Sequence, residues 1–182
     1  MAYLYWAIIT CEAAFWVVLL AAIGARYLWR RSQLSRALLL GLPLIDLLLL
    51  VFTALDLRSG STAEFAHGLA TAYVGFTLAF GGILVAWADA RFAHRFAGGV
   101  APAPAPTRGW PAVRYELRLW LRSVIAWAIT LALLSALVAF IDNREQTEAL
   151  EPWFRFAGGG VILWFLFGPA WSLVFFRRES LR

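Results

Sequence analysis

Long apolar stretches alternate with short polar segments along this chain, and five of the stretches are long enough to cross a membrane. They cover roughly residues 3–25, 37–55, 63–88, 123–141 and 152–176. A helical span needs about 20 apolar residues to cross about 30 Å of hydrocarbon. The apolar runs are continuous and lack the alternation of a transmembrane β-barrel. Because lipid-exposed backbone must satisfy its own hydrogen bonds, the pattern predicts an all-α, polytopic membrane protein with five transmembrane helices.

Composition supports the bilayer as the solvent for most of the chain. Of the 182 residues, 62% are hydrophobic, more than a soluble domain of this length can bury. Cys11 is the single cysteine, so no intrachain disulfide or thiolate metal cluster is expected. Residues 1–6 carry no positive charge, which argues against a cleaved signal peptide. We expect a multi-pass protein of the bacterial cytoplasmic (inner) membrane.

All 16 basic residues are arginines, and their distribution predicts the topology. Thirteen lie between spans one and two, between spans three and four, or after span five, whereas Arg58, Arg144 and Arg155 lie on the opposite side. The positive-inside rule then places the N-terminus outside and the C-terminus in the cytoplasm. Because these arginines are spread over several loops, with no basic soluble module, nucleic-acid binding is not predicted.

A Pro/Ala-rich segment, VAPAPAPTRGWP, separates the third span from the fourth. Such a segment favours an extended linker. It predicts a three-helix membrane unit over residues 1–99, a cytoplasmic linker over 100–113 and a two-helix unit over 114–182, all within one membrane domain.

Two carboxylates lie inside predicted spans. Glu12 is in the first span and Asp46 is in the second, three residues after Pro43, which should bend that helix. Ionisable residues in such positions are costly and usually face the bundle interior or a wet cavity. Three readings remain open: a hydrogen bond between helices, a proton or substrate site, or contact with another subunit.

The candidate proton or substrate site contains Glu12, Asp46, Asp56, Glu64 and His67. Glu64 and His67 have the Glu-x-x-His spacing of carboxylate-bridged metal sites, but the motif occurs once and near the headgroups, so no metal is predicted. His67 and His94 are about 40 Å apart if they share one helix, which excludes a haem held by both. No cofactor is expected.

A second candidate site lies at the cytoplasmic interface and would bind lipid headgroups. Its residues are Asp89, Arg91, His94, Arg95, Arg114, Arg118 and Arg122. The last three recur every four residues, so they share one face of a helix expected at the inner surface, where it would attract anionic lipids. The same arginines are also typical of a topology anchor.

No catalytic motif supports an enzyme. GxSxG, HExxH, the P-loop and the Gly-rich dinucleotide fingerprint are all missing, so no catalytic residue is assigned. An enzyme acting on lipid headgroups, with Arg and His as clamps and Asp89 as base, stays as a second alternative.

The strings DLRSGSTAEFAHG and WADARFAHRF resemble a family of small bacterial integral membrane proteins that has no established activity. The likeness covers about the first hundred residues. It implies a membrane protein and draws attention to Glu12, Asp46, Asp56, His67, Asp89 and His94 without giving them roles.

These observations favour an accessory or assembly component of the cytoplasmic membrane. Its expected partners are the bilayer with its anionic lipids, and either a second copy or another membrane subunit. The first alternative is a small proton-coupled transporter that uses Glu12 and Asp46.

Overall fold

The computed structural model describes residues 2–27, 29, 31–96 and 98–175. Every regular element in these residues is a helix, and five helical segments are long and apolar enough to cross a membrane. The prediction of an all-α protein with five candidate transmembrane helices is therefore confirmed.

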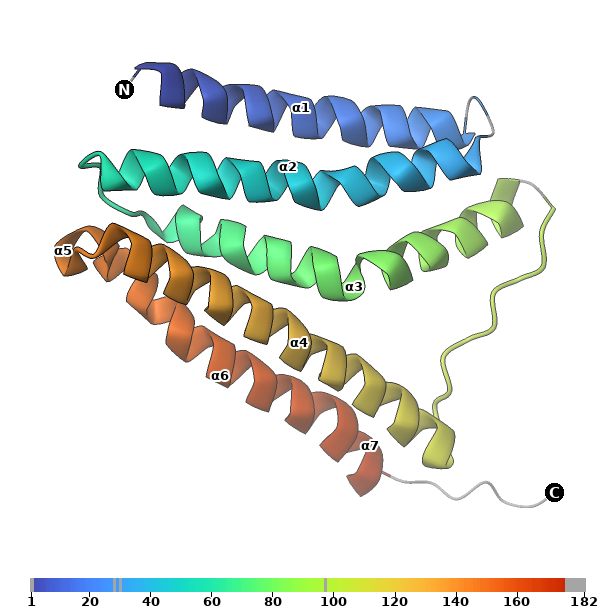
Figure 1. The fold of residues 1–182 in the computed structure, drawn as a ribbon. Coiled ribbons are helices and arrows are strands. Elements are labelled where there is room, and N and C mark those ends of the chain that lie inside the picture. Colours follow the sequence, from blue (N-terminus) through green and yellow to red (C-terminus); the bar gives the residue numbers. More distant parts are fainter. Residues whose placement is uncertain (1, 28, 30, 97, 176–182) are drawn as a thin grey trace, which may run out of the picture. The chain divides into compact units, whose positions relative to one another are not determined.

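Figure 1 shows the helices in chain order. They are α1 (Ala2–Tyr27), α2 (Ser32–Arg58), α3 (Phe65–Phe96), α4 (Gly109–Ile141), α5 (Arg144–Thr147), η1 (Glu148–Leu150), α6 (Glu151–Phe165), η2 (Leu166–Ala170) and α7 (Trp171–Val174). The segment 98–108 has no regular helix and joins α3 to α4.

Two helices are longer than the spans predicted from the sequence. Helix α3 continues to Phe96, and α4 already begins at Gly109. At about 1.5 Å per residue, the 33 residues of α4 reach about 50 Å, which exceeds the hydrocarbon thickness. The arginine-bearing segment before span four is helical and continuous with that span, and its place at the inner surface stays a prediction.

The proline and glycine positions affect the helices differently. Helix α2 runs through Pro43 without ending, and α6 runs through its three consecutive glycines 158–160. Gly168 and Pro169 instead lie in η2, a π-helical turn. In this turn the Trp171 N–H donates to the Leu166 carbonyl, five residues earlier, as is characteristic of a π-helix. Pro169 has no N–H, so it cannot make the hydrogen bond that an α-helix would need from this position.

The described residues pack as two compact units that cut across the long helices. One unit contains the described residues of the ranges 1–74 and 132–152, and the other contains those of the ranges 75–131 and 153–182. The division at the Pro/Ala linker that the sequence suggests stays a prediction.

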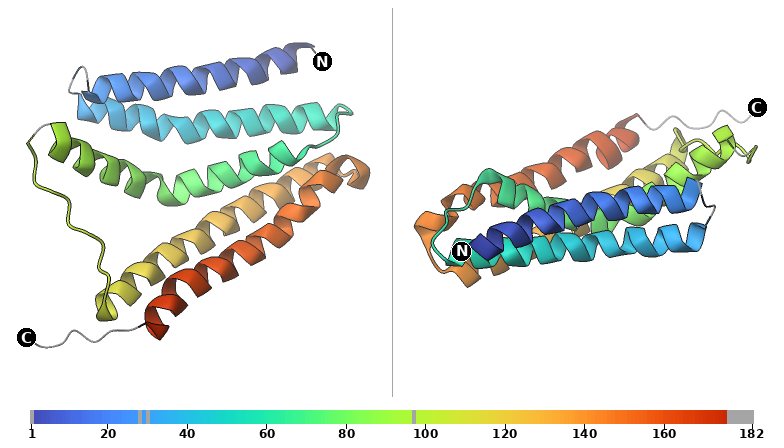
Figure 2. Two further views of the ribbon diagram at one scale, coloured as in Figure 1. Left: turned by 180° about the vertical axis from the view of Figure 1, so that it is seen from behind. Right: turned by 90° about the horizontal axis from the view of Figure 1, so that it is seen from above.

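In the first unit, α1 and α2 lie side by side and antiparallel (Figures 1 and 2). Their turn is closed by the Arg31 N–H, which donates to the Ala25 carbonyl over 2.8 Å. At the other end, the Ala63 N–H donates to the Gln146 carbonyl over 2.7 Å and so joins the turn before α3 to α5. The Phe15 and Tyr73 rings meet edge to face, with centroids 6.1 Å apart.

In the second unit, small residues and aromatic rings hold α3, α4 and α6 together. The Trp120 indole N–H donates to the Val161 carbonyl over 3.1 Å, and so links α4 to α6. The Phe76 ring meets the Trp127 ring edge to face at 5.3 Å. Gly160 packs against the same Trp127 indole, where a Cβ would come within 2.8 Å of Nε1. Close approach at small residues is typical of helix packing in membranes.

Candidate functional site

The two intramembrane carboxylates lie on neighbouring helices of the first unit. The Arg26 guanidinium donates to the Ser35 hydroxyl over 3.4 Å, which fixes the register of α1 against α2. Counted from that contact at about 1.5 Å per residue, Glu12 lies roughly 21 Å along α1 and Asp46 roughly 17 Å along α2. The two carboxylates are therefore at similar depth, but their environments differ. Glu12 is exposed, whereas Asp46 is partly buried.

Asp46 has one carboxylate oxygen enclosed by protein. Its Oδ2 is shielded from the surface and has no hydrogen-bond partner among the described residues. The helix-to-helix hydrogen bond considered for this residue is thus not made by that oxygen within the described part of the chain. A shielded oxygen without a donor is energetically unfavourable, so it is where a proton or an external donor would bind most favourably.

Glu64 and His67 form the best-defined contact of this site. The backbone N–H of Glu64 donates to Nδ1 of His67 over 2.8 Å, and the His67 N–H donates to the Glu64 carbonyl over 3.0 Å. The imidazole therefore satisfies a free donor just before the first turn of α3, as a capping side chain does. With Nδ1 occupied, the ring serves the local structure. Within the described residues, no group of three His, Cys, Asp or Glu side chains gathers.

Asp56 takes part in the turn that ends α2. Its carbonyl accepts the Ser59 N–H at 3.0 Å and the Ser59 hydroxyl at 2.7 Å. Of the five candidate residues, Glu64 and His67 contact each other, and no hydrogen bond or ion pair joins any other two in the described part of the chain. Their role in proton or substrate binding stays a prediction.

An apolar groove of about 330 Å³ is lined in part by α2 residues that follow Asp46 in the sequence. It is lined by α2 and α4, with Leu47, Leu50 and Val51 on one side and Leu133 and Leu137 among the residues on the other. Its lining is typical of a surface covered by hydrocarbon.

The predicted headgroup cluster begins at the end of α3. The side chain of Asp89 lies outside the described part of the structure. Arg91 lies over the Trp87 ring, with its Cζ 4.9 Å from the centroid. Nδ1 of His94 lies 3.0 Å from the Gly99 carbonyl.

The chain reverses directly after these residues. Gly98 has a φ of +66°, and the Gly99 N–H donates to the Ala93 carbonyl over 3.0 Å. This bond spans seven residues, one more than the 6→1 bond of a Schellman motif, and it turns the chain back onto the last turn of α3. His94 and Arg91 thus both have local partners at the end of α3, and the enzyme hypothesis stays a prediction.

The arginines at the start of α4 are exposed, and one of them links two helices. Arg114, Arg118 and Arg122 are all exposed, as is Arg95 at the end of α3. Nη1 of Arg122 donates to the Ala79 carbonyl of α3 over 3.0 Å. Arg118 and Arg122 also line a hollow of about 440 Å³ with Leu78, Ala79, Leu121 and Ile125. Two guanidinium groups beside one hollow suit an anionic group.

The sequence pattern did not single out Glu116, which lies on α4 between Arg114 and Arg118. The structure places it in an open pocket with Trp164 of α6 and Phe167 of η2. The spacing of the arginines could have indicated that Glu116 points away from them, because a residue two positions away lies on nearly the opposite side of the helix.

The chain is clearly similar to a known membrane protein. Over 146 residues the chain is 37% identical to "Uncharacterized membrane protein YmcC" of Bacillus subtilis strain 168. The aligned region covers 80% of this chain and 78% of that protein. No protein-family model and no solved structure matches. The similarity extends beyond the hundred residues on which the resemblance was based. The resemblance to small integral membrane proteins is thus confirmed, and the chain belongs to the family of the membrane protein YmcC.

Proposed function

We propose that the protein is an accessory or assembly subunit of the cytoplasmic membrane that binds another integral membrane protein through one face of α1. We call this the α1 face, and it consists of Ile9, Glu12, Ala13, Trp16, Leu20 and Ile23. All six residues are exposed, and Trp16 and Leu20 are 61% and 64% exposed. At 100° per residue they form a single stripe along the helix.

The exposure of Glu12 is the observation that carries this proposal. Glu12 lies in a candidate membrane span and makes no hydrogen bond or ion pair with the described residues. A charged side chain at the centre of a span costs about 2.5–3.5 kcal/mol, and such residues almost always face other protein or water. A lipid-facing Glu12 is therefore unfavourable, and a partner helix that covers it removes the cost.

The charge of Glu12 defines the chemistry of the partner. The partner presents a basic residue or a hydrogen-bond donor from a transmembrane helix at the depth of Glu12. A parallel two-fold dimer across the α1 face would bring two Glu12 carboxylates together, which is unfavourable because like charges repel. A different protein therefore fits better than a second copy. Trp16, one turn below Glu12, supplies the large ring that often anchors an interface.

The proposal includes an orientation. With the N-terminus outside and the C-terminus in the cytoplasm, the arginines at the turn after α1 and at the start of α4 lie at the inner surface, where the positive-inside rule places them. Glu12 then lies in the outer half of the membrane.

Site-specific photo-crosslinking in the native membrane tests the proposal. A crosslinking amino acid is introduced at Ala13 or Leu20 of the α1 face, and at Leu40 or Leu44 of α2 as matched exposed controls. We expect the two α1 positions, and neither control, to capture one integral membrane protein that native mass spectrometry finds in fixed stoichiometry. Glu12→Leu should abolish this complex, and so should removal of a basic or donor residue from the partner's span.

Three results would contradict the proposal. They are crosslinks to a second copy, equal capture from the α2 positions, and a complex that survives Glu12→Leu unchanged. Circular dichroism and melting of the extracted variants check that each one is folded.

One observation favours the proton-coupled transporter as a second candidate. The shielded Oδ2 of Asp46 has no donor among the described residues, and Glu12 lies at similar depth on the neighbouring helix. A transporter needs such a group inside the membrane to take up and release a proton.

A further inference from the structure

Glu116 is an acidic residue in a basic region, and its neighbours in sequence do not neutralise it. Arg114 and Arg118 flank it on α4, yet residues two positions apart lie on nearly opposite sides of a helix. Glu116 is half-buried and makes no hydrogen bond or ion pair with any described residue. Its carboxylate is therefore directed away from the arginine stripe and lacks a cation.

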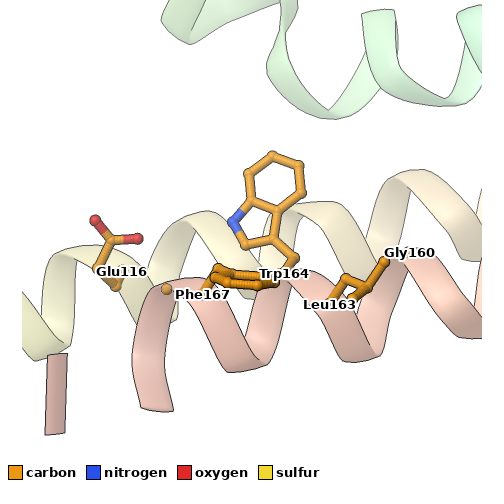
Figure 3. A pocket seen from close by; sticks show the side chains of 6 residues that line it. Glu116, Gly160, Leu163, Trp164 and Phe167 are labelled. Carbon is orange, nitrogen blue, oxygen red and sulfur yellow. The ribbon is translucent and has the colours of Figure 1, made fainter. Parts of the chain in front are cut away.

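A pocket of about 460 Å³ lies beside this carboxylate. Glu116 of α4 lines it together with Gly160, Leu163 and Trp164 of α6 and Phe167 and Gly168 of η2. Figure 3 shows the carboxylate of Glu116 and the indole of Trp164 standing on the same side of the helix pair. All six residues belong to the second compact unit, so the pocket lies within one unit.

The π-helical turn gives the carboxylate its place. An added Cβ on Gly168 would lie 3.0 Å from Oε2 of Glu116 and 3.5 Å from Cδ1 of Trp164. The absence of a side chain at this position thus lets the carboxylate approach the backbone of η2. Widened turns of this kind occur frequently at functional sites.

The aromatic walls narrow the class of ligand. The Trp164 ring stacks on Phe80 with a centroid separation of 5.5 Å, which holds the indole in place. One carboxylate among apolar and aromatic groups is a poor site for Ca²⁺ or Mg²⁺, because these ions need about six oxygen ligands. An anion would be repelled, and a hydrocarbon chain would leave the carboxylate unpaired. An alkylammonium group satisfies both parts of the pocket, through an ion pair with the carboxylate and cation–π contact with the rings.

We propose that the Glu116 pocket binds an organic ammonium group, with Glu116 as counter-ion and Trp164 and Phe167 as aromatic walls. Because Glu116 lies at the arginine-flanked end of α4, the pocket is at headgroup depth. The ammonium group can therefore belong to an aminophospholipid such as phosphatidylethanolamine, or to a free amine from the cytoplasm. This site shares no residue with the α1 face, and only the cytoplasmic source of the amine rests on the proposed orientation.

Binding to the purified full-length protein tests the proposal with both sources. In the first experiment, native mass spectrometry counts the phosphatidylethanolamine retained by protein from nanodiscs of phosphatidylethanolamine and phosphatidylglycerol. In the second, calorimetry follows ethanolamine binding to protein in phosphatidylglycerol nanodiscs. Glu116→Gln is compared with Glu148→Gln, which removes an exposed acid of the loop before α6. We expect at least a tenfold loss of binding in Glu116→Gln and no change in Glu148→Gln.

The two experiments distinguish the sources. Loss of the lipid alone, or of both ligands, identifies a headgroup site, and loss of ethanolamine alone identifies a site for a free amine. Unchanged binding of both ligands by folded Glu116→Gln would overturn the proposal. Should that variant fail to fold, competition on the unaltered protein decides. Ethanolamine or tetramethylammonium chloride should displace the bound ligand, and equal sodium chloride should not. Equal displacement by sodium chloride would overturn the proposal.

Discussion

Gly75 of α3 lies against Thr130 of α4 so closely that a Cβ at position 75 would overlap the Thr130 hydroxyl oxygen. That hydroxyl donates to the Ala126 carbonyl over 2.9 Å, and the same Cβ would also press on that carbonyl. Thr130 itself is fully buried. The contact therefore consists of backbone and a fixed side chain, neither of which can move aside easily.

We predict that Gly75→Ala destabilises the protein, although alanine is the better helix former. Forcing an extra methyl group into a filled contact typically costs about 1–3 kcal/mol, because the helices must move apart. Gly82→Ala is the matched control on the same helix, since a Cβ there meets nothing within 4 Å. It should be neutral or should stabilise by up to about 1 kcal/mol through helix propensity. Thermal unfolding in detergent compares the two variants, and a Gly75→Ala protein as stable as Gly82→Ala would contradict the prediction.

We predict a second stability effect at Arg122. Its Nη1 donates to the Ala79 carbonyl over 3.0 Å, whereas Arg118, one turn earlier on the same face, has no such bond among the described residues. Hydrogen bonds from a charged donor contribute about 1.5–3 kcal/mol, and interhelical bonds in membranes average about 0.6 kcal/mol. We expect Arg122→Leu to lose about 1 kcal/mol and Arg118→Leu to change stability little.

The melting temperature of a further Arg122 variant separates the effect of the hydrogen bond from the effect of the charge. Arg122→Lys keeps the charge but loses the planar group that reaches the carbonyl, so its melting temperature should lie between those of Arg122→Leu and the unaltered protein. Equal losses in Arg118→Leu and Arg122→Leu would show that both arginines act through the membrane surface and not through Ala79.

The sequence predicts the helices of this protein far better than the contacts between them. The lengths of the apolar stretches alone identify five spans, because each segment that crosses the hydrocarbon must be apolar and must satisfy its own backbone hydrogen bonds. WADARFAHRF and the two glycines after it predict where α3 ends, whereas the start of α4 was harder to predict, since VRYELRLWLR is polar enough to resemble a surface segment. Their helical hydrogen bonds continue past the apolar core regardless of polarity.

The contacts depend on which helix faces which, and no periodicity contains that information. The fit of Gly75 to Thr130 and of Gly168 to Glu116 requires neighbours more than 50 positions away in the chain. His67 illustrates the same limit at short range. Its spacing from Glu64 suggests metal ligation, yet its Nδ1 accepts a backbone N–H, which the side-chain pattern does not reveal.

Two substitutions of Asp46 test whether its carboxylate stabilises the fold or is kept for function. Because Oδ2 is shielded and has no hydrogen-bond partner among the described residues, Asp46→Leu should stabilise the protein by about 1–3 kcal/mol in detergent. Asp46→Asn keeps the shape and should change the melting temperature little. A loss of stability in Asp46→Leu would show that Asp46 has a partner that holds the helices together, contrary to this prediction.

The same variants test the transporter candidate in proteoliposomes that contain a pH-sensitive dye. Solutes are added one chemical class at a time, and proton movement is followed. If Asp46 carries a coupled proton, one class should drive proton movement in the unaltered protein and in the Glu148→Gln control, but not in Asp46→Asn. Proton movement that persists in folded Asp46→Asn would exclude Asp46 as the coupling group. Stabilisation by Asp46→Leu together with loss of coupled movement would indicate that the shielded carboxylate is kept for function at the expense of stability.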